Sequence, residues 1–338
     1  MFQRILVPLD GSPRAERALP VAARLAQASG GTVVLLRVVG LPTAIVPIPA
    51  PYPGTLRAII DADLAEARNS LGTLMKRSNL SGVHTEIEVI EGPTAATILA
   101  VTEAQHIDLI VLCSHGYTGF KRWVLGSVAE KVARYAPVPV LLLRAGGPAL
   151  VGAPPRAEGP LRALVPLDGS ARAKEAIVPA AQLIAALSAP GHGALHLTRV
   201  VVLPESAKTS QSEREAITHE ARQYLISTVQ QMREGLVASP VPSLKLAITW
   251  SVTIDDDSAA GILRVAEEGE DAQGAGELGR SEVIAMATHG YSGYERWAMG
   301  SVTERVLSGT KLPLLIVRPR EHHTPVAAMP VQDEGIAG

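Results

Sequence analysis

The sequence lacks the features that mark disulfide-rich, nucleic-acid-binding and membrane-spanning proteins. Cys113 is the only cysteine among 338 residues, which excludes a disulfide framework and a multi-cysteine zinc site and favours a reducing compartment. The 31 basic and 33 acidic residues give a net charge of −2, whereas a surface that coats nucleic acid needs a basic excess. Apolar runs such as 107–113 fall far short of the roughly 18 residues that span a bilayer. We therefore expect a cytoplasmic protein that binds neither nucleic acid nor membrane.

Aromatic residues are also scarce, at 3%, while hydrophobic residues make up 47% and charged residues 19%. This composition is typical of a globular protein with a core of Ala, Val, Leu and Ile, not of a disordered chain. At roughly 150 residues per domain, the length suggests two domains.

An internal repeat supports this division. The segment ILVPLDGSPRAERALPVAARLA from Ile5 returns from Ala163 as ALVPLDGSARAKEAIVPAAQLI, an offset of 158. SHGYTGFKRWVLGSVAEKV from Ser114 returns from Thr288 as THGYSGYERWAMGSVTERV, at an offset of 174, so the second copy has gained 16 residues. We expect the acidic, glycine-rich run 255–282 to hold much of this insertion as a solvated loop. The predicted organisation is a first domain 1–145, a Gly/Pro-rich linker 146–160, a second domain 161–320 and a disordered tail 321–338.

Strand and helix patterns alternate along the first copy. Near-continuous apolar runs predict parallel strands buried on both faces at Arg4–Leu9, Thr32–Val39 and Asp108–Ser114. The run His84–Glu91 alternates and predicts a strand with one face nearer to water. A last strand is expected at Val138–Arg144. Helices are expected at Pro13–Ala28, Leu56–Arg77, Thr94–Gln105 and Ser127–Tyr135. The order predicts α/β architecture, with two tandem doubly wound domains that each contain a five-stranded parallel sheet.

Prolines mark two further features. Pro20 and Pro179 lie inside predicted helices, where a missing backbone donor is expected to cause a kink. Five prolines between Leu41 and Gly54 indicate an extended or looped segment after the second strand, which is a candidate lid over a site.

Ligands of open α/β sheets bind outside the carboxyl ends of the strands. Three segments of the first copy should meet there, namely Pro8–Ser12, Val38 and Cys113–Gly116, followed by Gly126 and Ser127 at the start of a helix. The first turn of a helix offers unpaired N–H groups to a phosphate, and a glycine lets the phosphate approach the backbone. Lys121 and Arg122 lie on the intervening loop and supply positive charge.

Each candidate has an alternative structural role. Ser127 with Glu130, and Ser301 with Glu304, match the capping box, in which the serine caps its own helix. Asp10 and Asp168 suit ribose hydroxyls, but they also suit an Asx turn. Cys113, at the end of an apolar strand, is expected to be an inert buried thiol. The pair His322–His323 is a weak metal motif without further ligands, so we predict no metal site.

The motifs ILVPLDGS, LIVLCSHGYTGFKRWVLGSVAEKV and PVPVLLLR, and their counterparts in the second copy, resemble the universal stress protein family. The resemblance implies a five-stranded α/β fold, tandem or dimeric, in which some members bind ATP through a G-x2-G-x9-G-[ST] loop. Here the loop reads Cys113-x2-Gly116-x9-Gly126-Ser127 and Ala287-x2-Gly290-x9-Gly300-Ser301, so the first glycine is replaced in both copies. The nucleotide-binding residues that the resemblance implies, together with the histidine of each loop, are Pro8, Asp10, Val38, Leu112, Cys113, His115, Gly116, Gly126, Ser127, Val128, Pro166, Asp168, Val200, Met286, Ala287, His289, Gly290, Gly300, Ser301 and Val302.

Three functions are compatible with these residues. The leading hypothesis is a regulatory stress-response protein that binds ATP or a related adenine nucleotide, with Mg²⁺ accompanying it, and shows little or no turnover. A nucleotide-free scaffold for protein contacts is the alternative that the lost glycines favour. A weak ATPase or nucleotidyl-transfer enzyme, with His115 or His289 as a base, is the third, although neither an SGG-x-DS loop nor a HIGH-type motif is present, and we name no catalytic residue.

The last strand of each copy should lie at a sheet edge, where unpaired N–H and C=O groups invite another strand. Pro139 and Pro313 stand early in these strands, where a missing donor costs least. The linker keeps the sister strand at high effective concentration. We therefore predict an intramolecular pseudo-dimer with the two strands antiparallel and Leu142 close to Ile316. The same strands are candidates for homodimer formation.

Overall fold

The structure is a computed structural model that describes residues 1–40, 53–77, 80–114, 125–144, 146–152, 159–205, 210–238, 241–272, 276–288 and 299–319. The candidate lid up to residue 52, the loops 115–124 and 289–298, part of the linker and the tail from residue 320 lie outside these ranges.

The first copy alternates strands and helices in the predicted order. Its strands are β1 (Arg4–Pro8), β2 (Thr32–Val39), β3 (His84–Glu91), β4 (Leu109–Ser114) and β5 (Val140–Arg144). Its helices are the 3-10 turn η1 (Ala15–Arg17), α1 (Ala18–Ser29), α2 (Pro53–Arg77), α3 (Thr94–Ala104) and α4 (Ser127–Tyr135). The bounds predicted for β2, β3 and α4 coincide with those observed.

The second copy repeats this plan with one addition. Its main strands are β6 (Leu161–Pro166), β7 (Gly193–Val201), β8 (Ala247–Ile254), β11 (Val283–Ala287) and β12 (Leu314–Val317). Its helices are α5 (Ala171–Lys174), α6 (Ile177–Ser188), α8 (Gln211–Arg233), the 3-10 turn η2 (Val241–Leu244), α9 (Ser258–Glu268) and α10 (Ser301–Gly309). The addition is a small antiparallel pair of strands, β9 (Glu270–Ala272) and β10 (Gly276–Leu278).

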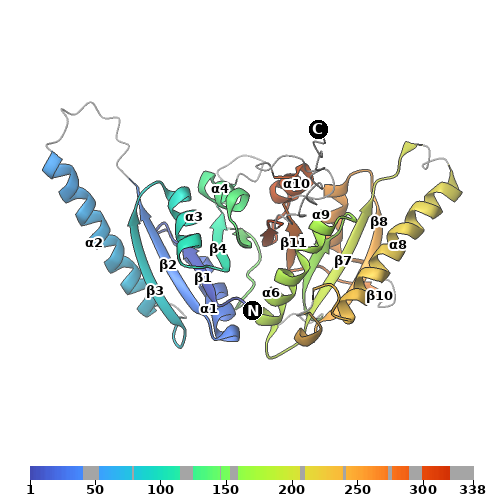
Figure 1. The fold of residues 1–338 in the computed structure, drawn as a ribbon, viewed down its shortest axis with the longest axis horizontal. Helices are drawn as coiled ribbons and strands as arrows, with labels where there is room; N and C mark the ends of the chain where they lie inside the picture. The colour runs from blue at the N-terminus through green and yellow to red at the C-terminus, as the bar shows by residue number, and fades with distance from the viewer. Residues whose placement is uncertain are drawn as a thin grey trace, which may run out of the picture.

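The two copies share one ten-stranded sheet, in the order β3-β2-β1-β4-β5-β12-β11-β6-β7-β8. Within each copy all neighbouring strands are parallel, as expected for a doubly wound domain. The second copy thus has the strand order of the first in reverse, counted from the middle of the sheet, with α2 at one end of the molecule and α8 at the other (Figure 1).

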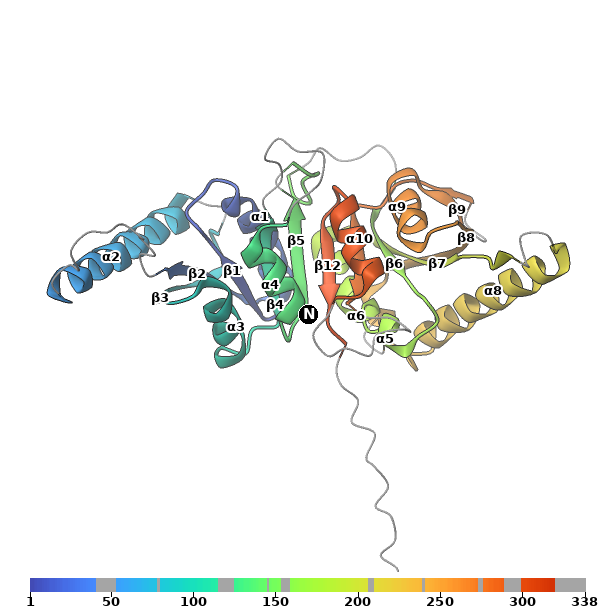
Figure 2. The same ribbon diagram turned by 90° about the horizontal axis from the view of Figure 1, so that it is seen from above.

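The copies meet through β5 and β12, which are antiparallel, as the sequence predicts (Figure 2). Leu315 lies opposite Leu141, Leu142 opposite Leu314 and Val140 opposite Ile316. The predicted neighbour of Leu142 was therefore wrong by two residues, a slip that keeps the side chain on the same face. Because β5 and β12 occupy each other's edges, neither is available to pair with a second chain, and the sheet ends at β3 and β8.

Each face of the sheet is covered by helices from both copies, and each core runs across the boundary. One core contains the buried faces of α1, α2, α6 and α8 with alternate strand residues such as Leu141 and Leu315. The other contains α3, α4, α9 and α10 with the intervening residues, among them Leu142 and Ile316. The period-two alternation of a strand thus divides its residues between two cores, which explains why the strand sequences are almost continuously apolar.

Two sequence predictions need correction. The run 255–282 is not simply a solvated loop: it contains α9 and the β9–β10 pair. From Thr94 to Leu109 the first copy spans 15 positions and from Ser258 to Val283 the second spans 25, so ten of the inserted residues lie here. The helix predicted at Pro13–Ala28 is also not continuous, because it is divided into η1 and α1, and the matching stretch of the second copy is divided into α5 and α6. Pro20 and Pro179 are the third residues of α1 and α6, so each interruption lies within the four residues before the proline, where a proline disrupts a helix.

Candidate functional site

The carboxyl ends of the central strands bring together the residues that the sequence singles out. β1 lies between β2 and β4, and the Leu9 N–H donates to the carbonyl of Leu36 at 2.8 Å. Pro8, at the end of β1, and Leu112, in β4, therefore end neighbouring strands, with Val38 in β2 at the same edge. Leu112 is buried, whereas Pro8 and Val38 are half-buried. In the second copy Pro166, Val200 and Met286 occupy the matching positions.

Asp10 and Asp168 each form an Asx turn directly after the first strand. Asp10 Oδ1 accepts the N–H of Ser12 at 2.8 Å, and Asp168 Oδ1 accepts that of Ser170 at 2.9 Å. The glycine between them, Gly11 or Gly169, has φ of +80° or +99°, a region that disfavours other residues. The Asx turn that the sequence suggested as the structural role of these aspartates is therefore present in both copies. Both aspartates remain exposed at the sheet edge.

The capping-box prediction is wrong in both copies. Gly126 is the N-cap of α4, with φ −61° and ψ 145°, and it has no side chain to cap the helix, so Ser127 is the first helical residue. Gly300 and Ser301 have the same arrangement in α10. Since a serine at this position is past the cap, its hydroxyl is not the group that closes the turn. The amide of Glu130 donates to the carbonyl of Gly126 at 2.9 Å, so the earlier amides of α4 precede the first hydrogen bond within the helix.

A pocket of about 410 Å³ lies at the start of α4 and is lined also by the start of α3. Ser127, Val128 and Lys131 line it from α4, while Pro93 and Thr94 line it from α3. Pro93 is the N-cap of α3 and provides no side-chain hydrogen bond, so two helix amino ends border one pocket without an acidic cap. Helix dipoles and unpaired amides of this kind favour an anion. The sequence analysis predicted the helix α3 but did not place it or Lys131 at the site. Lys131 could have been found, because it follows Ser127 by four residues and so shares its helix face.

The corresponding place in the second copy holds an internal anion. Asp257, which replaces Pro93, is the N-cap of α9 and its carboxylate accepts the N–H of Ala260 at 2.8 Å. The same carboxylate pairs with Arg305, which replaces Lys131 in α10. The N–H of Ala260 and, after it, Arg305 hold the pKa of Asp257 below its usual range. The amino end of α9 and the cation of α10 are thus already neutralised by this chain's own carboxylate.

The residues that replace the first loop glycine are small and largely covered. Cys113 is half-buried and Ala287 is buried. Burial raises the pKa of the Cys113 thiol, so it stays protonated at neutral pH, which agrees with an inert side chain. Val302 and Val200 are half-buried against the core beneath this edge, whereas Val128 is exposed.

The remaining predicted residues, His115, Gly116, Lys121, Arg122, His289 and Gly290, lie outside the described residues. Over the ranges that the structure describes, no group of three or more His, Cys, Asp or Glu side chains could hold a metal ion. Within the same ranges no helix is both long and apolar enough to cross a membrane.

Comparison with known proteins adds a second, independent line of information. The model of the universal stress protein family matches residues 1–144 and 161–318. The chain is 32% identical over 144 residues to universal stress protein MJ0531 of Methanocaldococcus jannaschii, covering 43% of this chain and 83% of that protein. It is 30% identical over 151 residues to universal stress protein YxiE of Bacillus subtilis, covering 43% of this chain and all of that protein.

A solved universal stress protein from Archaeoglobus fulgidus shares the whole arrangement, with a TM-score of 0.62 over 93% of this chain and 98% of that one. Its sequence identity is 18%, so this likeness concerns the fold.

Proposed function

The chain is a tandem member of the universal stress protein family, and from this membership we propose that it is a regulatory stress-response protein that binds ATP or a related adenine nucleotide in its first domain. We place the domains at 1–145 and 161–320 and the protein in the cytoplasm. The observation that carries the proposal is the pocket between α3 and α4, where two uncapped helix amino ends and Lys131 lie beside the loop that the family uses for phosphates.

The residues of the first domain suit the parts of such a nucleotide. The α4 amides behind Gly126, with the hydroxyl of Ser127 and the ammonium of Lys131, offer donors to phosphates. The exposed carboxylate of Asp10 offers an acceptor for ribose hydroxyls, and the half-buried Val38 offers an apolar contact for the base. Cys113 replaces the first loop glycine, but its backbone N–H remains, so the replacement changes the space beside the loop and not its donors.

The second domain is a poorer site for the same ligand. Its Asp257 carboxylate occupies the amino end of α9 and pairs with Arg305. A phosphate that entered there would meet a fixed negative charge and would have to displace an existing ion pair. We therefore propose one nucleotide per chain, bound without appreciable turnover, and Mg²⁺ only as a companion of the phosphates.

Calorimetric titration of the nucleotide-stripped full chain with ATP tests the proposal. We expect one site, removed by Gly126→Val, because the added branches block phosphate approach, and retained in the matched Gly300→Val variant. Binding in the wild type that survives Gly126→Val would place the nucleotide elsewhere. No binding by the wild type would favour the nucleotide-free scaffold, and rapid Mg²⁺-dependent phosphate release that Ser127→Ala abolishes would favour an enzyme.

A further inference from the structure

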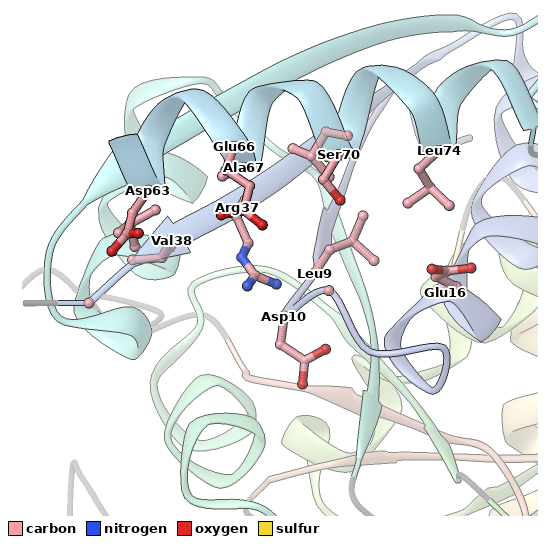
Figure 3. A pocket seen from close by; sticks show the side chains of 14 residues that line it. Leu9, Asp10, Glu16, Arg37, Val38, Asp63, Glu66, Ala67, Ser70 and Leu74 are labelled. Carbon is pink, nitrogen blue, oxygen red and sulfur yellow. The ribbon is translucent and has the colours of Figure 1, made fainter. Parts of the chain in front are cut away.

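A second pocket, of about 470 Å³, lies on the opposite face of the sheet, between the ends of β1 and β2 and helix α2 (Figure 3). Leu9, Ala67, Leu71 and Leu74 give it an apolar lining. Because Arg37 alternates with Val38 along β2, its side chain lies on the α1–α2 side, away from the pocket between α3 and α4. Figure 3 shows its guanidinium extending between Asp10 and the α2 residues Glu66 and Ser70.

The guanidinium of Arg37 is held without full hydrogen bonding. Its Nη1 is buried and has no hydrogen-bond partner among the described residues. A Cβ on Gly11 would come within 2.6 Å of this nitrogen, so the guanidinium rests directly on the glycine backbone. A buried donor without an acceptor is costly, which marks Arg37 as a side chain whose placement hydrogen bonds alone do not explain.

The second copy shows what can lie against the corresponding guanidinium. Arg199, the counterpart of Arg37, stacks on the ring of Tyr224, with its Cζ 5.1 Å from the ring centroid. Lys174, the counterpart of Glu16, places its Nζ 4.9 Å from the same centroid. Both distances are those of cation–π contacts, so this chain itself supplies an aromatic ring at this position of the fold.

Among the residues that the structure describes, the first copy has no such ring. Helices α2 and α8 both carry Glu-Ala-Arg-x-x-Leu, which aligns Ala67 with Ala221 and Leu71 with Leu225. All four are buried; Ala67, Leu71 and Leu225 belong to one core, and Ala221 belongs to a small neighbouring cluster. Ser70 then stands where the second copy has Tyr224. The serine leaves the space beside Arg37 open, and the pocket is lined by the three counterparts of the residues that form the second copy's stack, Glu16, Arg37 and Ser70.

The charges around the two positions also differ. Four carboxylates line the first pocket with one guanidinium, those of Asp10, Glu16, Asp63 and Glu66. At the corresponding positions the second copy has two acids, Asp168 and Glu220, two bases, Lys174 and Arg199, and the apolar Ile217. An external ring in the first pocket would therefore gain from an ammonium or other N–H donors, and an anionic ligand would be repelled.

We propose that this pocket binds a small planar aromatic molecule that carries a cationic amine, seated over Arg37 and Leu71 in the position that Tyr224 fills in the second copy. The ring contacts the guanidinium face and the apolar lining, while the amine lies by the carboxylate of Glu16, which stands where the second copy has the Lys174 ammonium beside its ring. The pocket lies on the other face of the sheet from the pocket between α3 and α4, but its lining includes Asp10 and Val38, which the proposed function assigns to the ribose and the base. Competition with ATP therefore decides whether the two sites are distinct.

Titration of the full chain with tyramine, followed by saturation-transfer NMR and calorimetry, tests the proposal. We expect one site at millimolar concentration, and weaker binding of p-cresol, which has the ring without the amine. Ser70→Tyr should lower tyramine affinity at least about tenfold, because the new ring fills the pocket, whereas Asn69→Tyr, on the exposed neighbouring position, should not. Tyr224→Ser should not add a second tyramine site, because Lys174 stands where Glu16 would meet the amine, and ATP should not displace tyramine.

Three results would overturn the proposal. One is no saturable tyramine binding by the wild type. A second is equal affinity in Ser70→Tyr and Asn69→Tyr, with both variants folded as the wild type. The third is competition between ATP and tyramine, which would make the pocket part of the nucleotide site. If the wild type binds tyramine but not ATP, the result contradicts the proposed function and supports this site.

Discussion

The guanidinium of Arg144, at the end of β5, donates a hydrogen bond to the carbonyl of Leu307 in the last turn of α10, across the boundary between the two copies. The relationship is reciprocal, because Arg318, just after β12, donates to the carbonyl of Tyr135 in α4 at 3.4 Å. Each copy thus supplies a cation to the carboxyl end of the other copy's last helix, where the carbonyls lack partners and the dipole is negative.

Removing Arg144 should weaken this junction more than removing Arg318. Arg144 is 2% exposed, and this burial lowers its pKa to about 10. Because the site is buried, little water can take over its hydrogen bond to the carbonyl of Leu307. We expect Arg144→Ala to lower the free energy of unfolding by about 2 kcal/mol, since a buried carbonyl loses its donor. Arg318→Ala, at a half-exposed site, should cost less than about 1 kcal/mol. Urea unfolding measures both; equal losses would mean that burial does not govern the contact.

The register of β5 and β12 can be tested by cross-linking in a Cys113→Ser background. Leu141 and Leu315 are opposite each other and belong to the same core, so cysteines there should form a disulfide within one chain. Cysteines at Leu141 and Ile316 point to opposite faces and should not. The linked fragments can be counted by mass spectrometry after proteolysis. Efficient bonding of the second pair would show a register shifted by one residue.

Much of the fold could be predicted because the repeat and the strand patterns are local signals. Val33 to Leu36 and Leu109 to Leu112 are continuous apolar runs, and two matching copies make the same assignment twice. The helix α9 was missed because the acidic and glycine-rich composition of 255–282 hid the spacing of Ile262, Val265 and Ala266, which are buried in the core. Composition averages over a window, whereas burial depends on which face each residue occupies.

The candidate site could be predicted only in outline. The sheet edge follows from the strand order, but the role of Ser127 depends on the backbone angles of Gly126, which a sequence does not give. Arg37 could have been singled out as a candidate binding residue, because it is the one charged residue in the strand TVVLLRVV. Its relation to Ser70 and Tyr224 depends on how the long helices pack against β2 and β7, which lie outside the repeated motifs.

A buried histidine should make the stability pH-dependent. His196 contacts the hydroxyls of Thr249 and Ser251 at 2.9 and 2.8 Å, and burial, aided by Arg162, lowers its pKa to about 4. The unfolded chain, with a pKa near 6.5, therefore binds the proton more readily, so stability falls as the pH drops from about 6.5 to about 4. Between pH 7 and pH 5 the expected loss from this group is about 2 kcal/mol.

The first copy provides the control for this prediction. Val34 occupies the position of His196, since each lies opposite the second residue of the repeated motif ILVPLDGS or ALVPLDGS, Leu6 or Leu164. His196→Val should therefore fold and should lose about 2 kcal/mol less than the wild type between the two pH values in urea unfolding. The same pH dependence in both proteins would assign it to other groups.

Asp257 combines two roles that two substitutions can separate. Its carboxylate caps α9 through Ala260 and pairs with Arg305. Asp257→Ala removes both and should lower the free energy of unfolding by about 1 kcal/mol, the usual cost of a lost N-cap. Asp257→Asn keeps an oxygen for the Ala260 N–H and should lower it by less than about 0.5 kcal/mol, while it removes the charge.

The neutral variant should also change ligand binding, because Arg305 then faces an uncharged side chain. If the Asp257 carboxylate is what closes the second domain to phosphate, ATP titration of Asp257→Asn should show two sites per chain where the wild type shows one. Adding Gly300→Val should return the count to one, since it blocks the start of α10. A single site in Asp257→Asn, with the wild type also binding one ATP, would mean that the difference between the domains lies elsewhere, and would direct attention to Ala287 and the shape of its loop.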